Sequence, residues 1–486
     1  MLEFSTARSG ATTVSINSRY LHSRVDPERE ACRFVEESSK ELGASPTCVV
    51  LVGTGLGYVT AALRKRWPEA RLIGVSLCSE LGARAVDRPD VVLDASSERF
   101  EEELFRQIET VNAEQPLVLR WNPAYRAFPE LGAAAEHLVG EIFRRITSSR
   151  ITTGYYGKRW ARTALYNVLT TQRSVTVTDL PSCIAVVAPG PSLEGILDEV
   201  CEPLRRVSVW ALSSAVPTLL SRSIEPDIVV TTDPGFYASH HIRELPSSVA
   251  IAMPLTADCR GGDWPKLIID QQSFVEASLF ARLSTFVPRL PAHGTVAGTV
   301  YHLATYLGIA NVVFLGFDLA NYDVHEHSRP HAFDRLLESA GSRLAPELTV
   351  KYGRAIADSS RISNTRWRTS RALDTYAAWF ETHATDALRV SGSPSRAGMQ
   401  TIGTDEFSRL ASASRGSLGL ASAEWPSFAR RQAAAAGVVS EWEALADSLS
   451  SHAEPRRTIA AHVGILTAVA LPELLRFRRA APPESA

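Results

Sequence analysis

The chain has 486 residues, which is enough for two or three domains that each bury a core of their own. Hydrophobic residues make up 45% and charged residues 21% of the sequence, the values of an ordinary soluble protein. The formal net charge of −2 gives no electrostatic reason to expect nucleic acid or an anionic membrane surface as a partner.

The cysteine spacing and the terminal segments bear on metal binding, disulfide bonds and location in the cell. The six cysteines are scattered without a C-x-x-C pair, so neither a zinc site nor a disulfide framework is indicated. The opening segment MLEFSTARSG lacks the charged and then apolar pattern of a signal peptide. The apolar stretch Ile459–Leu475 contains His462 and Pro472 and is too short and interrupted to span a membrane. We therefore expect a cytoplasmic protein without a membrane span.

Residues 1–150 are expected to form a Rossmann-like domain. A helix is predicted at Pro27–Leu42, because Asp26 suits an N-cap and a proline suits the first helical turn. Apolar strands then alternate with helical spacing, as in a βαβ unit. The expected strands are Cys48–Val52, Arg71–Val75, Asp90–Leu93 and Leu117–Leu119, and a helix at Tyr58–Arg66 joins the first two.

The first of these strands is followed by a glycine loop, Gly53-Thr54-Gly55-Leu56-Gly57. Such loops occur in dinucleotide and S-adenosylmethionine sites, where an acidic residue at the end of the second strand holds ribose. Here Gly74 to Leu77 end that strand without an acidic residue, and Glu80 comes several residues late. We therefore favour a structural loop that packs helix against strand, with a ligand site as the alternative.

Residues 151–410 are expected to form a doubly wound α/β domain. Apolar runs rich in β-branched residues have the length of buried parallel strands, at Ile184–Val187, Val207–Leu212, Ile228–Thr231, Val249–Met253 and Asn311–Leu315. Open α/β sheets bind ligands beyond the carboxyl ends of their strands. The residues there are therefore candidates for nucleotide binding: Gly190, Pro191, Ser192, Ser213, Ser214 and Asp233.

The turn at Gly190 has a physical reason to bind phosphate. Gly190 lets the backbone approach a ligand, Pro191 suits a first helical position, and Ser192 brings a hydroxyl to the free N–H groups of a helix start. Taken alone, this turn could equally be a plain connection from strand to helix. Thr295 joins the binding candidates as the expected N-cap of a later helix, in a segment of small residues that allow close approach.

Three histidines, His325, His327 and His331, lie close together after the last of these strands, with acidic residues between them. The i, i+2 spacing of His325 and His327 puts both rings on one side only in a strand, and no strand is predicted there. The segment also differs from the HExxH pattern of zinc proteases. No metal site is therefore expected. The structural alternative is that all three are solvated loop residues, above all His331.

Several stretches together resemble the motility accessory factor family. These stretches are GPSL, ALSSAVPTLLSRSIEPDIVVTTDP and HGTVAGTVYHLATYLGIANVVFLGFDLA in the central region. Tyr20-Leu21-His22-Ser23, Asp26–Ala31 and Gly55–Tyr58 resemble the family's N-terminal signature. Members are bacterial flagellin glycosyltransferases, and their central domain is similar to CMP-sialic-acid sialyltransferases and to archaeal 6-hydroxymethylpterin diphosphokinases. The resemblance extends over residues 15–405.

The resemblance implies an inverting glycosyltransferase that moves a nonulosonic (sialic-like) sugar from a CMP-activated donor to serine or threonine hydroxyls of flagellin. It places one histidine after the Asp318 of GFDLA, and this position is His327. A histidine is the general base in the related sialyltransferases, and imidazole can take a hydroxyl proton near neutral pH. Asp318 would order the loop, and Gly190 to Ser192 would cradle the donor phosphate. No metal or other cofactor is implied.

Two other functions stay open. In a pterin diphosphokinase, Asp233 and Asp318 would hold a Mg²⁺ ion that bridges nucleotide phosphates. In a non-enzymatic assembly factor for flagellin, the pocket would be retained for structure alone. The oligomeric state is not indicated by the sequence.

The last part of the chain is expected to be largely helical. Residues 333–410 show helical spacing with a glycine-containing strand near their end. Residues 411–486 are interpreted as a small helical domain for acceptor or partner binding, with helices at Glu441–Leu449 and Arg457–Phe477. The tail Ala480–Ala486 is expected to be disordered.

Overall fold

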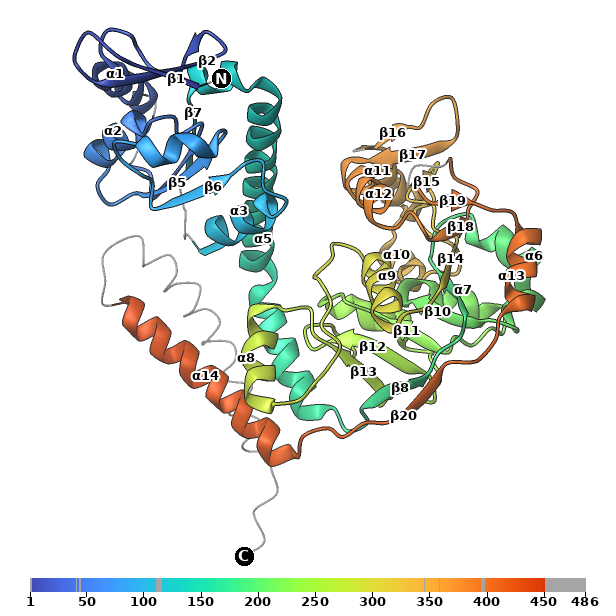
Figure 1. Cartoon of the computed structure of the whole chain (residues 1–486). Helices are drawn as coiled ribbons and strands as arrows, with labels where there is room; N and C mark the ends of the chain where they lie inside the picture. The colour runs from blue at the N-terminus through green and yellow to red at the C-terminus, as the bar shows by residue number, and fades with distance from the viewer. Residues whose placement is uncertain are drawn as a thin grey trace, which may run out of the picture. The chain divides into compact units, whose positions relative to one another are not determined.

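The structure is a computed structural model that describes residues 2–40, 42, 45–110, 116–344, 346–357, 359–394 and 398–450. The chain divides into two compact units, residues 1–153 and 154–486, and each is described by itself (Figure 1). The long helix α5 (Pro129–Thr170) begins in the first unit and ends in the second. The division falls close to the expected boundary at residue 150.

The first unit holds a parallel sheet in the order β6-β5-β4-β7 and an antiparallel sheet in the order β1-β2-β3. Its strands are β1 (Leu2–Thr6), β2 (Thr12–Ile16), β3 (Arg19–Tyr20), β4 (Cys48–Val52), β5 (Arg71–Ser76), β6 (Val91–Asp94) and β7 (Pro116–Arg120). Its helices are α1 (Pro27–Ser39), α2 (Tyr58–Arg66), η1 (Ser79–Arg84, a 3₁₀ helix), α3 (Phe100–Thr110) and α4 (Asn122–Ala127). The predicted alternation of strands and helices is confirmed.

The start of α1 agrees with the sequence. The side chain of Asp26 accepts a hydrogen bond from the backbone N–H of Arg29 at 3.0 Å, which is the N-cap geometry expected of an aspartate. The helix ends at Ser39, before the predicted Leu42, because the N–H of Leu42 closes a turn on the Ser39 carbonyl.

The second unit is built on an eight-stranded parallel sheet in the order β13-β12-β11-β10-β9-β14-β18-β19. Its strands are β9 (Cys183–Val187), β10 (Ser208–Leu212), β11 (Ile228–Val230), β12 (Ala250–Pro254), β13 (Lys266–Ile269), β14 (Asn311–Leu315), β18 (Leu388–Val390) and β19 (Gln400–Thr401). The chain adds strands on one side of β9 as far as β13 and then returns to the other side at β14. This is a doubly wound sheet, as predicted, and its order reverses between β9 and β14.

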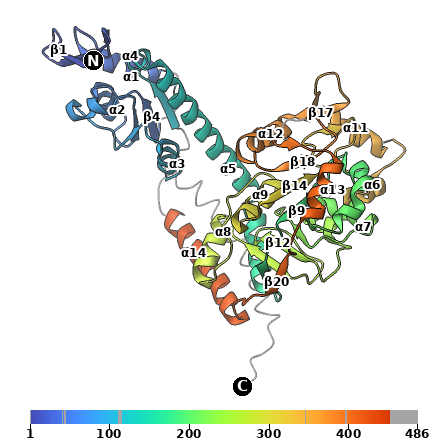
Figure 2. The ribbon, with the colours of Figure 1, turned by 45° about the vertical axis from the view of Figure 1, so that its right-hand side comes forward.

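Helices cover both faces of this sheet (Figures 1 and 2). Along β9, Ala185 and Val187 belong to one core, whereas Ile184 and Val186 belong to the other, because successive side chains of a strand point to opposite faces. The first core includes α5, α6 (Leu193–Leu204), α7 (Val216–Ser221), α8 (Phe274–Leu283), α13 (Thr404–Ala413) and α14 (Phe428–Ser450). The second core includes α9 (Val296–Leu307) and α12 (Arg371–His383).

Some elements of the second unit are absent from the sequence predictions. Strand β13 begins with Lys266, a buried lysine that breaks the apolar pattern of a core strand. Residues 333–410, expected to be mostly helical, also hold strands of a small antiparallel sheet. The remaining elements are η2 (Ser213–Ala215), η3 (Phe236–Ile242), β15 (Asn321–Tyr322), α10 (Ala332–Ala340), α11 (Glu347–Ala357), β16 (Ser359–Arg361) and β17 (Trp367–Ser370).

The described residues after 410 belong to the second unit. Strand β20 (Gly419–Ser422) pairs antiparallel with β8 (Val175–Asp179), and Val438 of α14 lies in the first core of the central sheet. Arg431 donates from Nη1 to three carbonyl oxygens at the end of α5, those of Val168, Leu169 and Thr171, at 2.9, 2.8 and 2.8 Å.

The expected separate domain at 411–486 is therefore not seen up to residue 450. The helix predicted at Arg457–Phe477 and the predicted tail lie outside the described residues.

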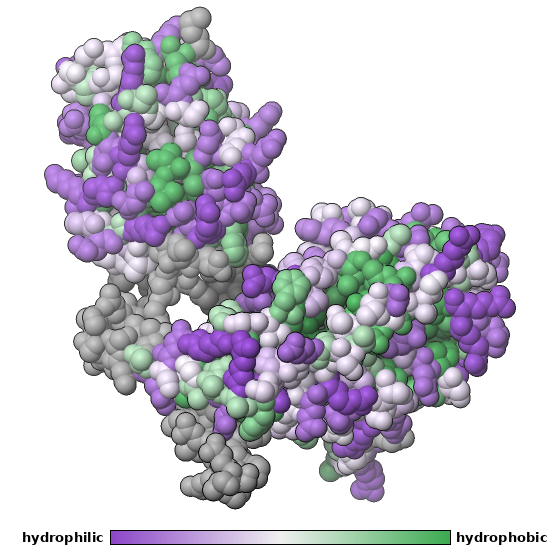
Figure 3. All heavy atoms as spheres, turned by 60° about the horizontal axis from the view of Figure 1, so that its bottom comes forward, coloured by the Kyte–Doolittle hydropathy of each residue, from purple (hydrophilic) through white to green (hydrophobic). Residues whose placement is uncertain are grey.

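The described helices include none that is both long enough and apolar enough to cross a membrane. On the face shown in Figure 3, hydrophobic side chains gather in separate areas between hydrophilic ones.

Candidate functional site

The candidate site lies where the strand order of the central sheet reverses. Strands β9 and β14 are parallel neighbours, with Val187 opposite Leu315. The turns that follow them, from Pro189 and from Gly316, leave the same edge of the sheet. Open α/β sheets bind ligands at this kind of reversal, because the connecting loops separate there.

Gly190 brings these two turns into contact. Its N–H donates to the carbonyl oxygen of Gly316 at 2.9 Å. A Cβ atom at Gly190 would lie 2.2 Å from that oxygen and 2.5 Å from a carboxylate oxygen of Asp318. Only glycine permits this approach, so its absent side chain serves packing between two turns.

Asp318 is the centre of the contact. Its carboxylate accepts hydrogen bonds from the backbone N–H of Ser192 at 2.8 Å, the Ser192 hydroxyl at 2.6 Å and the Ser391 hydroxyl at 2.5 Å. Asp318 is buried, with 2% of its surface exposed. Burial raises the pKa of the Asp318 carboxyl, and the bonds from Ser192 and Ser391 act against that rise.

These contacts change the interpretation of Ser192. Its N–H and hydroxyl, which the sequence suggested for donor phosphate, are both bonded to Asp318. An internal carboxylate thus lies at the start of α6, where the helix dipole favours negative charge. Asp318 ties together the turns after β9, β14 and β18, and its contacts are those of a residue that orders loops.

The loop with the three histidines is fastened to the same turn. The N–H of Ser328 donates to the Pro189 carbonyl at 2.8 Å, and the Ser328 hydroxyl lies 2.9 Å from that of Thr218. The N–H of Arg329 donates to Glu194 of α6 at 3.0 Å. These bonds fix the two residues that directly follow His327 and so hold the His327 segment beside the turn after β9.

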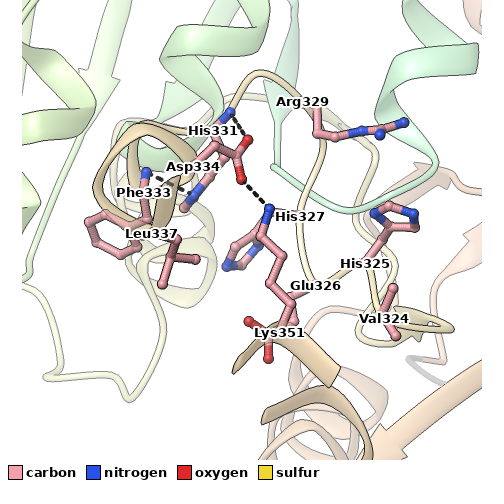
Figure 4. A pocket seen from close by; sticks show the side chains of 10 residues that line it. All are labelled: Val324, His325, Glu326, His327, Arg329, His331, Phe333, Asp334, Leu337 and Lys351. Atoms are coloured by element: carbon pink, nitrogen blue, oxygen red, sulfur yellow. Dashed lines mark hydrogen bonds and ion pairs between the residues drawn. The ribbon is translucent and has the colours of Figure 1, made fainter. Parts of the chain in front are cut away.

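His327 borders a cavity of about 190 Å³, the histidine cavity (Figure 4). The cavity is lined by Val324, His325, Glu326, His327, Arg329, His331, Phe333, Asp334, Leu337 and Lys351. Lys351 of α11 donates to Asp334 at 2.8 Å. Figure 4 shows Arg329 pointing away from Asp334, on the side where His325 lies. The cavity therefore combines imidazole rings with groups of both charges.

The ring of His327 stacks on that of His331, with 4.5 Å between centroids. Desolvation by the surrounding protein lowers the pKa of His327, whereas the Asp334 charge and the Pro189 carbonyl raise it. The residue is nevertheless exposed to solvent, which limits the desolvation. A neutral imidazole open to the cavity can accept a proton from a bound hydroxyl group.

The other two histidines are less exposed than the solvated loop residues that the structural alternative describes. His325 is half-buried and exchanges two backbone hydrogen bonds of 2.9 Å with Tyr322. His331 is buried, with 7% of its surface exposed, and caps α10 by accepting the N–H of Phe333 on Nδ1. The interpretation of His331 as a solvated residue is therefore wrong, because its ring fills the space between His327 and His241.

The other residues predicted to bind the nucleotide lie along the same edge of the sheet and form no hydrogen bond with Asp318. Ser213 and Ser214 form η2 directly after β10. Asp233, after β11, is exposed and accepts the N–H of Gly235 at 2.7 Å. Thr295 caps α9, where its hydroxyl accepts from Gly298 at 3.0 Å and lies 3.1 Å from Nδ1 of His293.

In the described part of the chain, no group of three or more His, Cys, Asp or Glu side chains is arranged to hold a metal ion. Of the two carboxylates considered for Mg²⁺, Asp318 is buried with its oxygens bonded to Ser192 and Ser391, whereas Asp233 is exposed. The sequence missed Asp334, Lys351 and His241, and their scattered positions gave no motif that would have found them.

Protein groups pack closely against two glycines of the glycine loop in the first unit. Nε2 of His22 accepts the N–H of Leu56 at 2.9 Å, and a Cβ atom at Gly55 would lie 2.5 Å from that nitrogen. A Cβ atom at Gly57 would lie 2.1 Å from the carbonyl oxygen of Asp87. Both glycines permit close packing, as the structural interpretation requires. On another side the loop borders a cavity of about 320 Å³, which Gly55, Gly57, Ser76 and Asp94 help to line.

Three comparisons place this fold among known proteins. Residues 164–324 match the family described as 6-hydroxymethylpterin diphosphokinase MptE-like. An uncharacterized protein of Treponema pallidum (strain Nichols) is 29% identical over 271 residues, which are 55% of this chain and 57% of that protein. The chain thus spans little more than half the length of this relative.

The MAf glycosyltransferase from Magnetospirillum magneticum AMB-1 has a similar solved structure. The TM-score is 0.57 at 12% sequence identity, over 97% of this chain and 85% of that one. The fold is therefore a mixed α/β architecture like that of a glycosyltransferase, with an MptE-like region in its central sheet.

Proposed function

We propose that this protein is a glycosyltransferase that moves a nonulosonic (sialic-like) sugar from a CMP-activated donor to serine or threonine hydroxyls of flagellin. The likeness in fold to the MAf glycosyltransferase supports the transferase class. The main support from the site is His327, an exposed imidazole in a cavity beside the turns that Asp318 holds together. Donor, sugar and acceptor follow from the sequence resemblance.

In the proposed reaction, His327 takes the proton of the acceptor hydroxyl. The hydroxyl oxygen forms a bond to the anomeric carbon of the sugar while the bond from that carbon to the phosphate oxygen breaks. CMP leaves with the electron pair, and attack from the opposite side inverts the anomeric configuration. General base assistance of this kind contributes about 10²- to 10⁴-fold to the rate.

Asp318 acts indirectly in this proposal. Its carboxylate fixes the turns after β9, β14 and β18, and the first of these carries the Pro189 carbonyl that holds the His327 loop. A base must lie within hydrogen-bond reach of the proton that it removes, so the loop position matters for the rate. Arg329 and Lys351 line the cavity, but each is paired with carboxylates, Arg329 with Glu194 and Lys351 with Asp334 and Glu347.

The direct test uses purified full-length protein, flagellin and a CMP-activated nonulosonic sugar. We expect the intact mass of flagellin to increase by whole sugar units, and flagellin from a strain without this protein to lack that modification. Unmodified flagellin in the reaction, together with normally modified flagellin from the deletion strain, would refute the proposal.

A second candidate function, a 6-hydroxymethylpterin diphosphokinase, is favoured by the family match of residues 164–324. It would require Mg²⁺ to bridge nucleotide phosphates. The two functions differ in their response to a chelator. Transfer to flagellin should persist in EDTA, whereas pyrophosphate transfer to a pterin should stop and return with Mg²⁺. Loss of sugar transfer in EDTA with Mg²⁺ rescue would favour the second function.

A further inference from the structure

A second and larger cavity lies on the other side of His331. Its volume is about 380 Å³, and it is bounded by α7, by η3 and by the segment that leads into α10. Because α7 follows β10 and η3 follows β11, the cavity belongs to the ligand-binding edge of the sheet. The lining residues are Pro217, Leu220, Ser221, His240, His241, Arg243, Glu244, Pro330, His331, Ala332 and Leu336. We call it the paired-histidine cavity.

Two buried histidines form one wall of this cavity. His331 and His241 are 7% and 8% exposed, and their ring centroids are 4.8 Å apart. His331 accepts the N–H of Phe333 on Nδ1 at 3.4 Å, a contact drawn in Figure 4, so its neutral ring carries the proton on Nε2. Among the described residues, neither Nε2 of His331 nor Nδ1 of His241 has a hydrogen-bond partner.

Unpaired buried ring nitrogens are unfavourable unless a ligand pairs with them. Burial lowers the pKa of His331 to about 2 and that of His241 to about 4, so both rings are neutral at physiological pH. The cavity therefore offers hydrogen-bonding groups without charge from these rings. Pro217, Leu220 and Leu336 supply an apolar surface beside them.

A pocket that combines an apolar surface with fixed polar groups suits a flat heterocycle. The position of His331 adds a constraint, because it borders both this cavity and the histidine cavity that holds His327. A ligand that occupies both would place its heterocycle on one side of His331 and its reacting part on the other.

We propose that the paired-histidine cavity binds the base of the nucleotide donor and that the rings of His331 and His241 turn on binding, because both unpaired nitrogens are enclosed by protein. His331 Nε2 then donates to a ring acceptor, and His241 Nδ1 pairs with a second polar atom of the base. This inference rests on the proposed function, since it concerns the donor of that reaction. It adds His241 and His331 as specificity-determining residues for the base, separate from His327, which acts on the acceptor.

The test is calorimetric titration of the full chain with CMP and with ribose 5-phosphate, which lacks the base. His331→Asn keeps an N-cap acceptor for α10 and removes the Nε2 donor. His241→Phe keeps a buried ring and removes its nitrogens. His302→Phe is the matched control, because His302 packs against Trp379 and lies outside both cavities.

We expect each cavity variant to weaken CMP binding about ten- to a hundredfold, with ribose 5-phosphate binding and the control unchanged. Wild-type CMP affinity in both variants, with unfolding midpoints showing that they are folded, would overturn the inference and leave the transferase proposal intact. If CMP does not bind the wild-type chain, the inference fails as well, and the flagellin assay then decides whether the transferase proposal survives.

Discussion

The carboxylate of Asp318 accepts both the backbone N–H and the hydroxyl of Ser192, a residue 126 positions away in the chain. The two residues follow β9 and β14, which are adjacent only because the sheet order reverses between them. This pair holds the centre of the candidate site in one arrangement, and its removal should be measurable as lost stability.

Asp318→Asn should lower the free energy of unfolding by about 1–3 kcal/mol, because an amide cannot accept all the hydrogen bonds that the carboxylate accepts at this buried position. Urea denaturation of the full chain measures the change. Asp233→Asn is the control, since Asp233 is exposed and should shift stability by less than about 0.5 kcal/mol. If both substitutions changed the free energy of unfolding by the same amount, the hydrogen bonds of Asp318 would not stabilise the fold as expected.

His327→Ala should lower the turnover number for sugar transfer about 10²- to 10⁴-fold with little change in donor affinity, because a base acts in the transition state alone. His325→Ala, in the same loop and lining the same cavity, is the control and should have a milder effect. Steady-state kinetics with flagellin as acceptor provide both constants. Normal turnover in His327→Ala with loss in His325→Ala would move the base two residues along the loop.

Gly55→Ala should destabilise the first unit by about 1–3 kcal/mol, because the backbone there has a φ of +53° and the new Cβ would collide with His22. Gly82→Ala is a suitable control, since nothing lies within 4 Å of its Cβ position. Thermal unfolding of the full chain distinguishes the two variants. In the same preparations, S-adenosylmethionine and NAD should not bind. Tight calorimetric binding of either ligand would show that the glycine loop is a ligand site.

Stability should depend on pH through His22. Burial lowers the pKa of His22 to about 4, below its ordinary value of 6.5. Between those two values the unfolded chain binds a proton that the folded chain does not. The free energy of unfolding should therefore fall as the pH drops below 6.5, by about 1.4 kcal/mol per pH unit from this residue.

His22→Gln keeps an acceptor for the Leu56 N–H and removes the titration, so its unfolding free energy should vary less steeply over the same pH range. Urea denaturation at several pH values compares the slopes. Identical slopes for the variant and the wild-type chain would mean that His22 does not contribute to the pH dependence of stability.

Much of the fold could be predicted because the central strands are continuous β-branched runs. Strands β9, β10 and β14 follow those runs within one residue at each end. Strand β13 was missed because Lys266 opens it, and β17 because its residues, WRTS, are mostly polar. Short or polar strands form through pairing with neighbours, which no local pattern records.

The candidate site was predictable in its position but only partly in its contacts. The residues at strand ends were found because parallel strands present their carboxyl ends at one edge. The bond of Ser192 to Asp318 and the packing of His241 on His331 join residues that are distant in sequence. The order of the strands in the sheet determines which distant residues meet, and this order cannot be read directly from a single sequence.

Arg431 donates to three carbonyl oxygens at the end of α5, and Val438 completes a core that begins in the same helix. On the ribosome, the parallel strands of the second unit are synthesised long before these residues emerge. The nascent second unit must therefore keep part of its apolar surface uncovered until residues 431 to 438 have been made, whereas the first unit can complete its own core much earlier.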